Sequence, residues 1–360
     1  MTRGVLLFVL CTALPAAAQP QPVAQPAVLP NVRVIATGGT IAGVQDAPGT
    51  LGDYRSGTRT VNEIVQSVPE LSRFAQIETE QFSNVPSNEI MPSQWLGLAK
   101  RINELLQRSD LSGIVVTHGT DRLEETAFFL YLTVKSDKPV VVVGSQRPAT
   151  GISPDGPINL LSAVRTAGAS QARGMGVLVV MDDRIISARE NRKLYPRTGG
   201  FSGGEMGMIG VVAANGPEFF FRPVRRHGAD TEFDVATLDT LPKVELVYSY
   251  PGSDGPRLGE GTQGMVITTT GLSPSEREAF TDIRRKGVVM VQVFPSGEHV
   301  ANNFQRGAGP RPAGQGDNAQ ALPPTVAVQH LLPQKARILL MLALTRTRDP
   351  REVQRIFDEY

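Results

Sequence analysis

Short apolar runs recur along the first half of the chain, and longer stretches with helical spacing separate them. The runs are rich in β-branched residues and are apolar at every position, whereas a half-exposed strand alternates apolar with polar residues. Continuous apolar runs are typical of parallel strands that are covered on both faces. We expect such strands at Val32–Thr37, Gly113–His118, Pro139–Gly144 and Gly176–Met181.

Three stretches between these runs have the spacing of helices. In Ser93–Arg108, large apolar residues fall on one helical stripe, and Pro92 stands just before it, where proline suits a helix start. The other two stretches are Asp121–Lys135 and Pro157–Ala169. This alternation of strands and helices predicts an α/β fold with a doubly wound sheet, of the Rossmann-like or flavodoxin-like kind.

A polar, irregular stretch, Arg225–Leu241, interrupts the alternation, which then resumes. The later strands are expected at Lys243–Ser249, Gly264–Thr270 and Gly287–Phe294, and the later helices at Ser273–Lys286, Gln334–Thr345 and Pro350–Phe357. We therefore expect a larger N-terminal α/β domain over residues 31–224, an interdomain linker over 225–241, and a smaller C-terminal α/β domain over 242–360. Asn303–Pro324, rich in Gly and Pro, is expected to be a long surface loop.

Residues 1–18 have the pattern of a cleaved secretory signal. Arg3 supplies a positive charge, Val5–Leu14 is apolar, and Ala16-Ala17-Ala18 fits a cleavage site. An apolar run this short does not span a hydrocarbon core about 30 Å thick, which argues against a membrane anchor. We expect a periplasmic or secreted protein without membrane attachment after cleavage, beginning with a flexible leader over residues 19–30.

Charge and composition narrow the classes of partner. The chain has 36 Lys and Arg against 35 Asp and Glu, so it lacks the electrostatic footprint of a nucleic-acid binder. Its four histidines show no metal-ligand spacing, and its single cysteine, Cys11, lies in the signal segment. We expect no metal and no other cofactor.

Two loops at the ends of expected strands combine glycines with hydroxyl groups. They are Ala36-Thr37-Gly38-Gly39-Thr40 and Thr117-His118-Gly119-Thr120-Asp121. Ligands of open α/β sheets bind beyond the carboxyl ends of strands. The spacing matches neither the dinucleotide nor the P-loop fingerprint, which argues against a phosphate turn. Taken alone, Asp121 is more readily explained as the N-cap of the following helix.

At these loops the chain resembles the bacterial type II L-asparaginases, a family that includes the glutaminase-asparaginases. The similarity runs from Leu29 to Tyr360. Its strongest stretches are Ala36–Gly43, Val116–Leu132, Asp137–Gly144 and Pro333–Ala343.

The resemblance implies catalytic roles for five residues. Thr40 matches the primary nucleophile, and Tyr54 matches the tyrosine of a mobile loop that contacts it. Thr120 matches a second catalytic threonine. Lys193 matches the lysine that pairs with Thr120 and with Asp121, and Asp121 matches the carboxylate that holds the substrate's α-amino group. Without the resemblance, Lys193 would be read as a solvated lysine in a charged run. Tyr54 could pack in a loop, but its polar and flexible setting favours a lid role at least as much.

Further positions are expected to bind substrate. Ser87 matches the serine that binds the α-carboxylate, and the backbone of Ser145 is expected near the departing amide. Asn88 stands where many relatives have Gln. Asp317 is the plausible counterpart of an acidic residue that relatives place before the segment containing Pro333. Gly271–Ser275 departs from a Gly-Asn-Gly-Asn-like segment by which, in the family, a neighbouring subunit completes the site.

The resemblance implies an amidohydrolase that converts L-asparagine to L-aspartate and ammonia through a threonine acyl-enzyme. A glutaminase-asparaginase with comparable use of L-glutamine is the alternative within the enzyme class. An amino-acid-binding protein that has lost turnover is the alternative outside it. The family assembles as homotetramers with sites between subunits, and we expect the same here. His118 is expected to be structural, because no pattern provides a Ser/His/Asp triad.

Overall fold

The computed structural model describes residues 28–47, 53–297, 323–328 and 330–360. The expected signal segment and Asp317 therefore lie outside the described residues, as do most of the expected leader and of the expected loop Asn303–Pro324. Within the described residues, no helix is long and apolar enough to cross a membrane.

The N-terminal part of the chain folds around an eight-stranded sheet in the order β12-β11-β8-β7-β6-β5-β1-β4. Strands β4, β1, β5, β6 and β7 are parallel, and β8, β11 and β12 add an antiparallel edge. The strands are β1 (Asn31–Gly38), β4 (Gln76–Val85), β5 (Leu111–Thr117), β6 (Val140–Val143), β7 (Val177–Met181), β8 (Arg184–Ser187), β11 (Met208–Ala213) and β12 (Gly216–Phe219).

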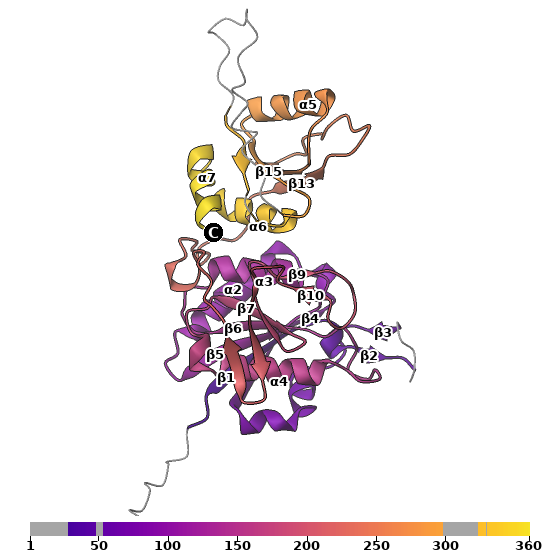
Figure 1. Cartoon of the computed structure of the whole chain (residues 1–360), viewed down its shortest axis with the longest axis vertical. Coiled ribbons are helices and arrows are strands. Elements are labelled where there is room, and N and C mark those ends of the chain that lie inside the picture. Colours follow the sequence, from indigo (N-terminus) through magenta and orange to yellow (C-terminus); the bar gives the residue numbers. More distant parts are fainter. Residues whose placement is uncertain (1–27, 48–52, 298–322, 329) are drawn as a thin grey trace, which may run out of the picture.

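Helices cover both faces of this sheet, so the predicted doubly wound α/β fold is confirmed (Figure 1). One face carries α2 (Pro92–Leu106) and α3 (Leu123–Thr133), and the other carries α1 (Val61–Gln66) and α4 (Gly156–Ala167). The four buried strands and three helices expected in this region are all present, with ends that differ by a few residues. The strand order 2-1-3-4-5 of the parallel part is the flavodoxin-like order.

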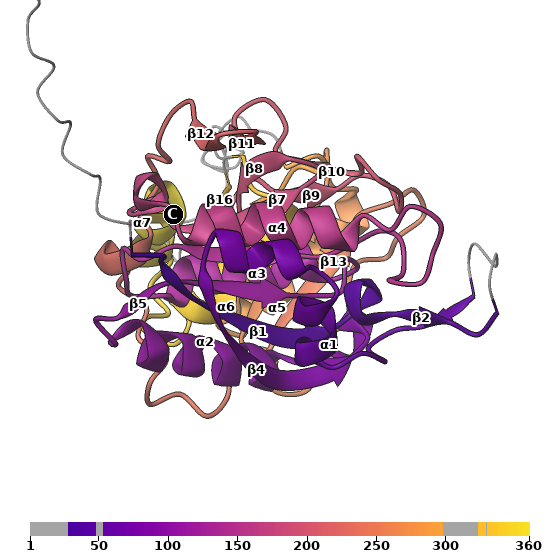
Figure 2. The same cartoon turned by 90° about the horizontal axis from the view of Figure 1, so that it is seen from below.

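The small elements of this domain include two short antiparallel ribbons. One joins β2 (Val44–Gln45) to β3 (Tyr54–Arg55), and Figure 2 shows it extending from the side of the domain. The other joins β9 (Arg192–Lys193) to β10 (Phe201–Ser202). The 3-10 helices are η1 (Thr40–Ala42), η2 (Pro69–Arg73), η3 (Ser87–Glu89), η4 (Ser170–Ala172) and η5 (Gly228–Asp230).

The C-terminal part forms a separate four-stranded parallel sheet in the order β13-β14-β15-β16. Helix α5 packs on one face, and α6 packs on the other, next to α7 (Figure 1). Ser273 caps α5 through its hydroxyl and the following Pro274, as expected. The elements are β13 (Val244–Tyr248), β14 (Gly264–Thr268), α5 (Pro274–Arg285), β15 (Val289–Val293), β16 (Val326–Ala327), α6 (Pro333–Ala343) and α7 (Pro350–Glu359).

The two sheets meet through a pair of helices that are apolar along most of their length and almost wholly buried. Helix α3 of the large domain lies against α6 of the small domain, and one continuous hydrophobic core runs through both. A helix that is apolar all round must be covered on all sides. Here the large sheet covers α3 on one side and α6 covers it on the other, so α3 and α6 lie between the two sheets.

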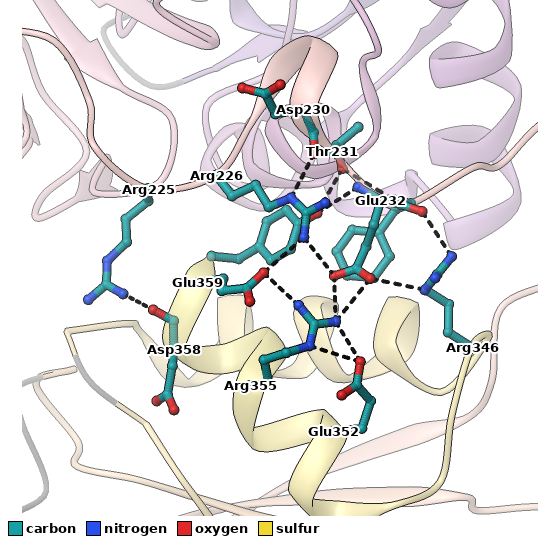
Figure 3. A network of polar contacts seen from close by, with 12 residues as sticks. Arg225, Arg226, Asp230, Thr231, Glu232, Arg346, Glu352, Arg355, Asp358 and Glu359 are labelled. Carbon is teal, nitrogen blue, oxygen red and sulfur yellow. Dashed lines mark hydrogen bonds and ion pairs between the residues drawn. The ribbon is translucent and has the colours of Figure 1, made fainter.

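Residues 225–241 are irregular, as expected, but ion pairs tie them to the C-terminal helix. Figure 3 shows Arg226 and Arg355 flanking Glu232, whose side chain is only 11% exposed. Arg346 adds a third cation to the same carboxylate at 3.3 Å. Buried charges are tolerated only when they are paired, and Glu232 is paired from three sides. This stretch therefore joins the domains as a packed element.

Candidate active site

The two threonine loops meet at the switch point of the large sheet. The chain leaves β1 toward β4 on one side and returns to β5 on the other, so the carboxyl ends of β1 and β5 open a crevice between them. Ligands of doubly wound sheets bind in this crevice. Thr40 follows β1 in η1, and Thr120 follows β5 just before α3.

Glycines let the two loops touch backbone to backbone. Gly39 has a φ of +86°, and a β-carbon placed on it would stand 2.2 Å from the Cα of Gly119. Likewise, a β-carbon on Gly119 would stand 2.8 Å from the Oγ of Ser87. No side chain fits at such distances, so the glycines bring Thr40, Ser87 and Thr120 around one space.

That space is a cavity of about 170 Å³. Drug-sized ligands occupy pockets of roughly 300–1,000 Å³, so a cavity of this size suits a smaller molecule. Of the predicted site residues, Thr40, Tyr54, Ser87, Thr120 and Asp121 line it, together with Gly39, Ser56, Pro86 and Gly119.

Thr40 and Tyr54 form the first polar pair of the cavity. Their hydroxyl oxygens are 2.7 Å apart, and Thr40 is 6% exposed. Tyr54 lies on β3, and its ring occupies the space in which Gly43 lacks a side chain. Either hydroxyl can donate. When Thr40 donates to Tyr54, the lone pairs of the threonine oxygen are free to attack a ligand.

Thr120, Lys193 and Asp121 form the second group. The Lys193 ammonium donates to the Thr120 hydroxyl at 2.8 Å and to the Asp121 carboxylate at 2.7 Å. An ammonium has donors only, so the Thr120 oxygen accepts and its hydrogen remains available to the cavity. Lys193 is 16% exposed and Asp121 is 68% exposed. Lys193 is therefore not the solvated lysine of a charged run.

Asp121 is not the N-cap of α3. The helix begins at Leu123 after Arg122, and neither residue 121 nor residue 122 caps it with a side chain. The hydroxyl of Ser87 instead accepts hydrogen bonds from the backbone N–H groups of Asp121 and Arg122, at 3.2 and 3.3 Å. With both lone pairs engaged, the Ser87 hydrogen can point only toward an outside acceptor. A hydroxyl held this way, at the start of a helix, favours an anion such as a carboxylate.

Among the described residues, two of the predicted binding residues do not line this cavity. Asn88 lies in η3, next to Ser87, but its side chain is exposed. Ser145 is fully buried, and its hydroxyl donates to the carbonyl of Arg147. Asp317 lies outside the described residues. The hydroxyl of Ser273, in the segment that departs from the family pattern, accepts the cap hydrogen bond of α5.

His118 belongs to the second loop and is fully buried. Its Nδ1 lies 2.7 Å from the carbonyl oxygen of Gly119. Burial lowers the pKa of His118 to about 4, because the charged imidazolium is poorly solvated there. A ring that stays neutral and holds the loop backbone agrees with the structural role expected of it.

Glu124 contacts Lys193, and the sequence did not point to it as part of the site. One of its carboxylate oxygens accepts the backbone N–H of Lys193 at 2.8 Å, and the other accepts from the side-chain amide of Gln334 in the small domain. The only signal in the sequence is its place on α3, one turn after Asp121. Among the described residues, no group of three or more His, Cys, Asp or Glu side chains could hold a metal ion.

Comparison with known proteins identifies the family. The model of the asparaginase N-terminal domain matches residues 31–225, and that of the glutaminase/asparaginase C-terminal domain matches residues 243–357. L-asparaginase 2 of Bacillus subtilis is 44% identical over 343 residues, which cover 92% of this chain and 87% of that protein. The glutaminase-asparaginase of Pseudomonas fluorescens biotype A is 39% identical over 366 residues, covering 99% and 97%.

A solved structure agrees with these sequence matches. The crystal structure of a probable cytoplasmic L-asparaginase from Campylobacter jejuni superposes with a TM-score of 0.82 at 33% identity, over 92% of this chain and 100% of that one. The resemblance inferred from the two threonine loops is thereby confirmed. Both family models match in order and together span nearly all of the described residues, and the chain belongs to the asparaginase family.

Proposed function

We propose that this protein hydrolyses the side-chain amide of L-asparagine to L-aspartate and ammonia in the cavity between the two threonine loops. The observation that carries the proposal is that one small cavity holds two threonine hydroxyls, and that each of them is hydrogen-bonded to a different polar side chain. Thr40 is hydrogen-bonded to Tyr54, and Thr120 is hydrogen-bonded to Lys193. Two differently held hydroxyls are what an acyl transfer needs: one to attack, and one to donate.

The substrate is held by its α-groups. Ser87, whose hydrogen is free, donates to the α-carboxylate at the start of α3. The exposed Asp121 carboxylate binds the α-ammonium group. These two contacts leave the side-chain amide beside Thr40 and Thr120.

The reaction then proceeds in two steps. The Thr40 oxygen attacks the amide carbon as its proton passes to the Tyr54 oxygen, which releases its own proton toward the leaving nitrogen. The Thr120 hydroxyl donates to the developing oxyanion. Loss of one such donor typically costs about 10²–10³ in rate. The C–N bond breaks, the leaving nitrogen takes up the proton, and an aspartyl ester on Thr40 remains. Water attacks this ester and releases aspartate, which restores the Thr40 hydroxyl.

L-Glutamine is the second candidate substrate, because relatives of this chain are named glutaminase-asparaginases. Glutamine is longer by one methylene. A difference of this size changes binding by about 1–3 kcal/mol, so it sets a preference and not an exclusion.

We further propose that the protein is exported, with residues 1–18 removed, and that it works as a homotetramer. One relative carries the name of a probable periplasmic L-asparaginase. The 68% exposure of the Asp121 side chain in the single chain leaves an open side to the cavity, which a neighbouring subunit would cover.

One experiment tests the activity and the assembly together. The protein is separated by size exclusion with light scattering, and each fraction is assayed for ammonia release from L-asparagine, L-glutamine and D-asparagine. We expect activity in the tetramer fraction, with L-asparagine the best substrate. No ammonia from any amide would refute the proposed function, and activity confined to a monomer would refute the shared site.

A further inference from the structure

The first turn of α6, in the small domain, reaches the strand that carries Lys193 by two separate routes. Gln334 and Lys335 follow Pro333, which starts the helix. Their side chains leave the small domain and end on polar groups of the large domain. Neither residue lines the cavity, and both are absent from the chemistry proposed above.

The first route passes through Glu124. The side-chain amide of Gln334 donates to Oε1 of Glu124, while Oε2 of the same carboxylate accepts the backbone N–H of Lys193 at 2.8 Å. The carboxylate is therefore held from both sides. A carboxylate with both oxygens engaged has a fixed plane, which fixes the position of the Lys193 backbone.

The second route is a buried cation. The Lys335 ammonium is fully buried and donates to three backbone carbonyls, those of Ala188, Arg189 and Asn191, at 3.0, 2.7 and 2.5 Å. Three donors meet three acceptors, so the ammonium is satisfied. The carbonyls belong to the turn that leads into β9, and Asn191 stands two residues before Lys193.

This arrangement is costly if it serves stability alone. Burial lowers the pKa of Lys335 to about 8, which records the desolvation of its charge. Removing the ammonium alone would leave three buried carbonyls without this donor, because backbone partners stay when the side chain is changed. What an apolar side chain cannot do is hold three carbonyls of one turn in place.

We propose that Gln334 and Lys335 are positioning residues, which set the backbone of Lys193 so that its ammonium reaches both Thr120 and Asp121. The inference rests on the proposed function. In catalytic sites a misplacement of about 1 Å can cost about 10²-fold in rate. The small domain thus acts on the site within its own subunit, through α6.

Three variants test the proposal. Gln334→Leu removes the hydrogen bond to Glu124 at a half-buried position. Lys335→Met removes the three hydrogen-bond donors while keeping the length of the side chain. Arg337→Met is the matched control. Arg337 lies on the same helix and also donates to a backbone carbonyl, that of Val244, but this partner is inside the small domain.

The first readout is steady-state kinetics on L-asparagine. We expect kcat to fall about tenfold in Gln334→Leu and further in Lys335→Met, with a smaller change in KM, because Ser87 and Asp121 still bind the α-groups. Such a fall corresponds to about 1.4 kcal/mol of transition-state stabilisation. Arg337→Met should keep its kcat.

The second readout does not depend on activity. The chain has seven lysines, so an NMR spectrum of ¹³C-labelled lysine side chains is simple to assign, and Lys193→Met identifies the Lys193 signal. That signal should shift in Gln334→Leu and stay in place in Arg337→Met. If Lys335→Met does not fold, the kcat and the Lys193 signal of Gln334→Leu test the proposal.

An unchanged Lys193 signal together with an unchanged kcat in folded Gln334→Leu would overturn the proposal. Failure of the proposed function would look different. Wild-type protein would then release no ammonia, while the Lys193 signal would still report whether α6 positions that residue.

Discussion

At the scale of single residues, the hydroxyls of the site differ in the hydrogen bonds that each can still form with a ligand. Ser87 accepts from two backbone N–H groups and Thr120 accepts from Lys193, so both present hydrogens to the cavity. Thr40 shares a hydrogen bond with Tyr54 alone among the described side chains. The residue types of this site could be taken from the sequence through the resemblance. Which of their lone pairs accept hydrogen bonds could not be predicted from the sequence, because this depends on atoms that only the fold brings together.

The role of His118 gives a pH prediction. Its pKa in the folded protein is about 4, below the ordinary value of 6.5. Between these two pH values the unfolded chain binds a proton that the folded chain does not. The stability that His118 contributes is therefore complete above pH 6.5 and is lost as the pH falls toward 4, by up to about 3 kcal/mol.

Urea unfolding at pH 7 and at pH 4.5 checks this prediction. His118→Gln keeps a polar side chain of similar reach but has no group that titrates in this range. We expect the free energy of unfolding to fall less in the variant than in the wild type over this interval. An equal fall in both proteins would show that His118 is not the group responsible.

At the scale of elements, the buried parallel strands could be predicted from the sequence because they are apolar at every position. The edge strands could not. Strand β4 reads as mixed polar and apolar residues, since one long side of it meets solvent, and its half-exposed side chains gave no clear pattern. The antiparallel strands β8, β11 and β12 contain polar residues or glycine, so none of them is a continuous apolar run of the kind that marks the buried parallel strands. Helix α5 was predictable down to its cap, because Ser273-Pro274 is a local signal.

The contact between the two threonine loops gives a prediction with a matched control. Gly39 and Gly252 have nearly the same φ, +86° and +84°, but a β-carbon on Gly252 would meet nothing within 4 Å. Alanine at either position bears the cost of a positive φ, which is on the order of 1–3 kcal/mol for a residue other than glycine. Gly39→Ala also forces the loops apart, for which a further 1–3 kcal/mol or so is typical.

Thermal unfolding and ammonia release together check this difference. Gly39→Ala should lower the unfolding temperature more than Gly252→Ala does, and it alone should lose most activity. If Gly39→Ala were as active and as stable as Gly252→Ala, the backbone contact at the switch point would not be what shapes the cavity.

At the scale of the whole molecule, the two domains share one core and one ion-pair cluster. Helices α3 and α6 pack together, and Glu232 ties residues 225–241 to Arg355 of α7. The division into two α/β units followed from the sequence pattern. The link from Gln334 to Glu124 spans 210 positions in the chain and could not be inferred from either segment alone. Such links appear only when the domains are docked.

We propose that Thr40 is the nucleophile of an asparagine amidohydrolase. The most direct test is the steady-state rate of ammonia release from saturating L-asparagine by Thr40→Ala, measured beside Thr40→Ser and the wild type. We expect Thr40→Ala to bind asparagine but to lose turnover by on the order of 10³-fold or more, and Thr40→Ser, which keeps a hydroxyl, to retain part of the turnover. Undiminished turnover in Thr40→Ala would show that Thr40 is not the nucleophile.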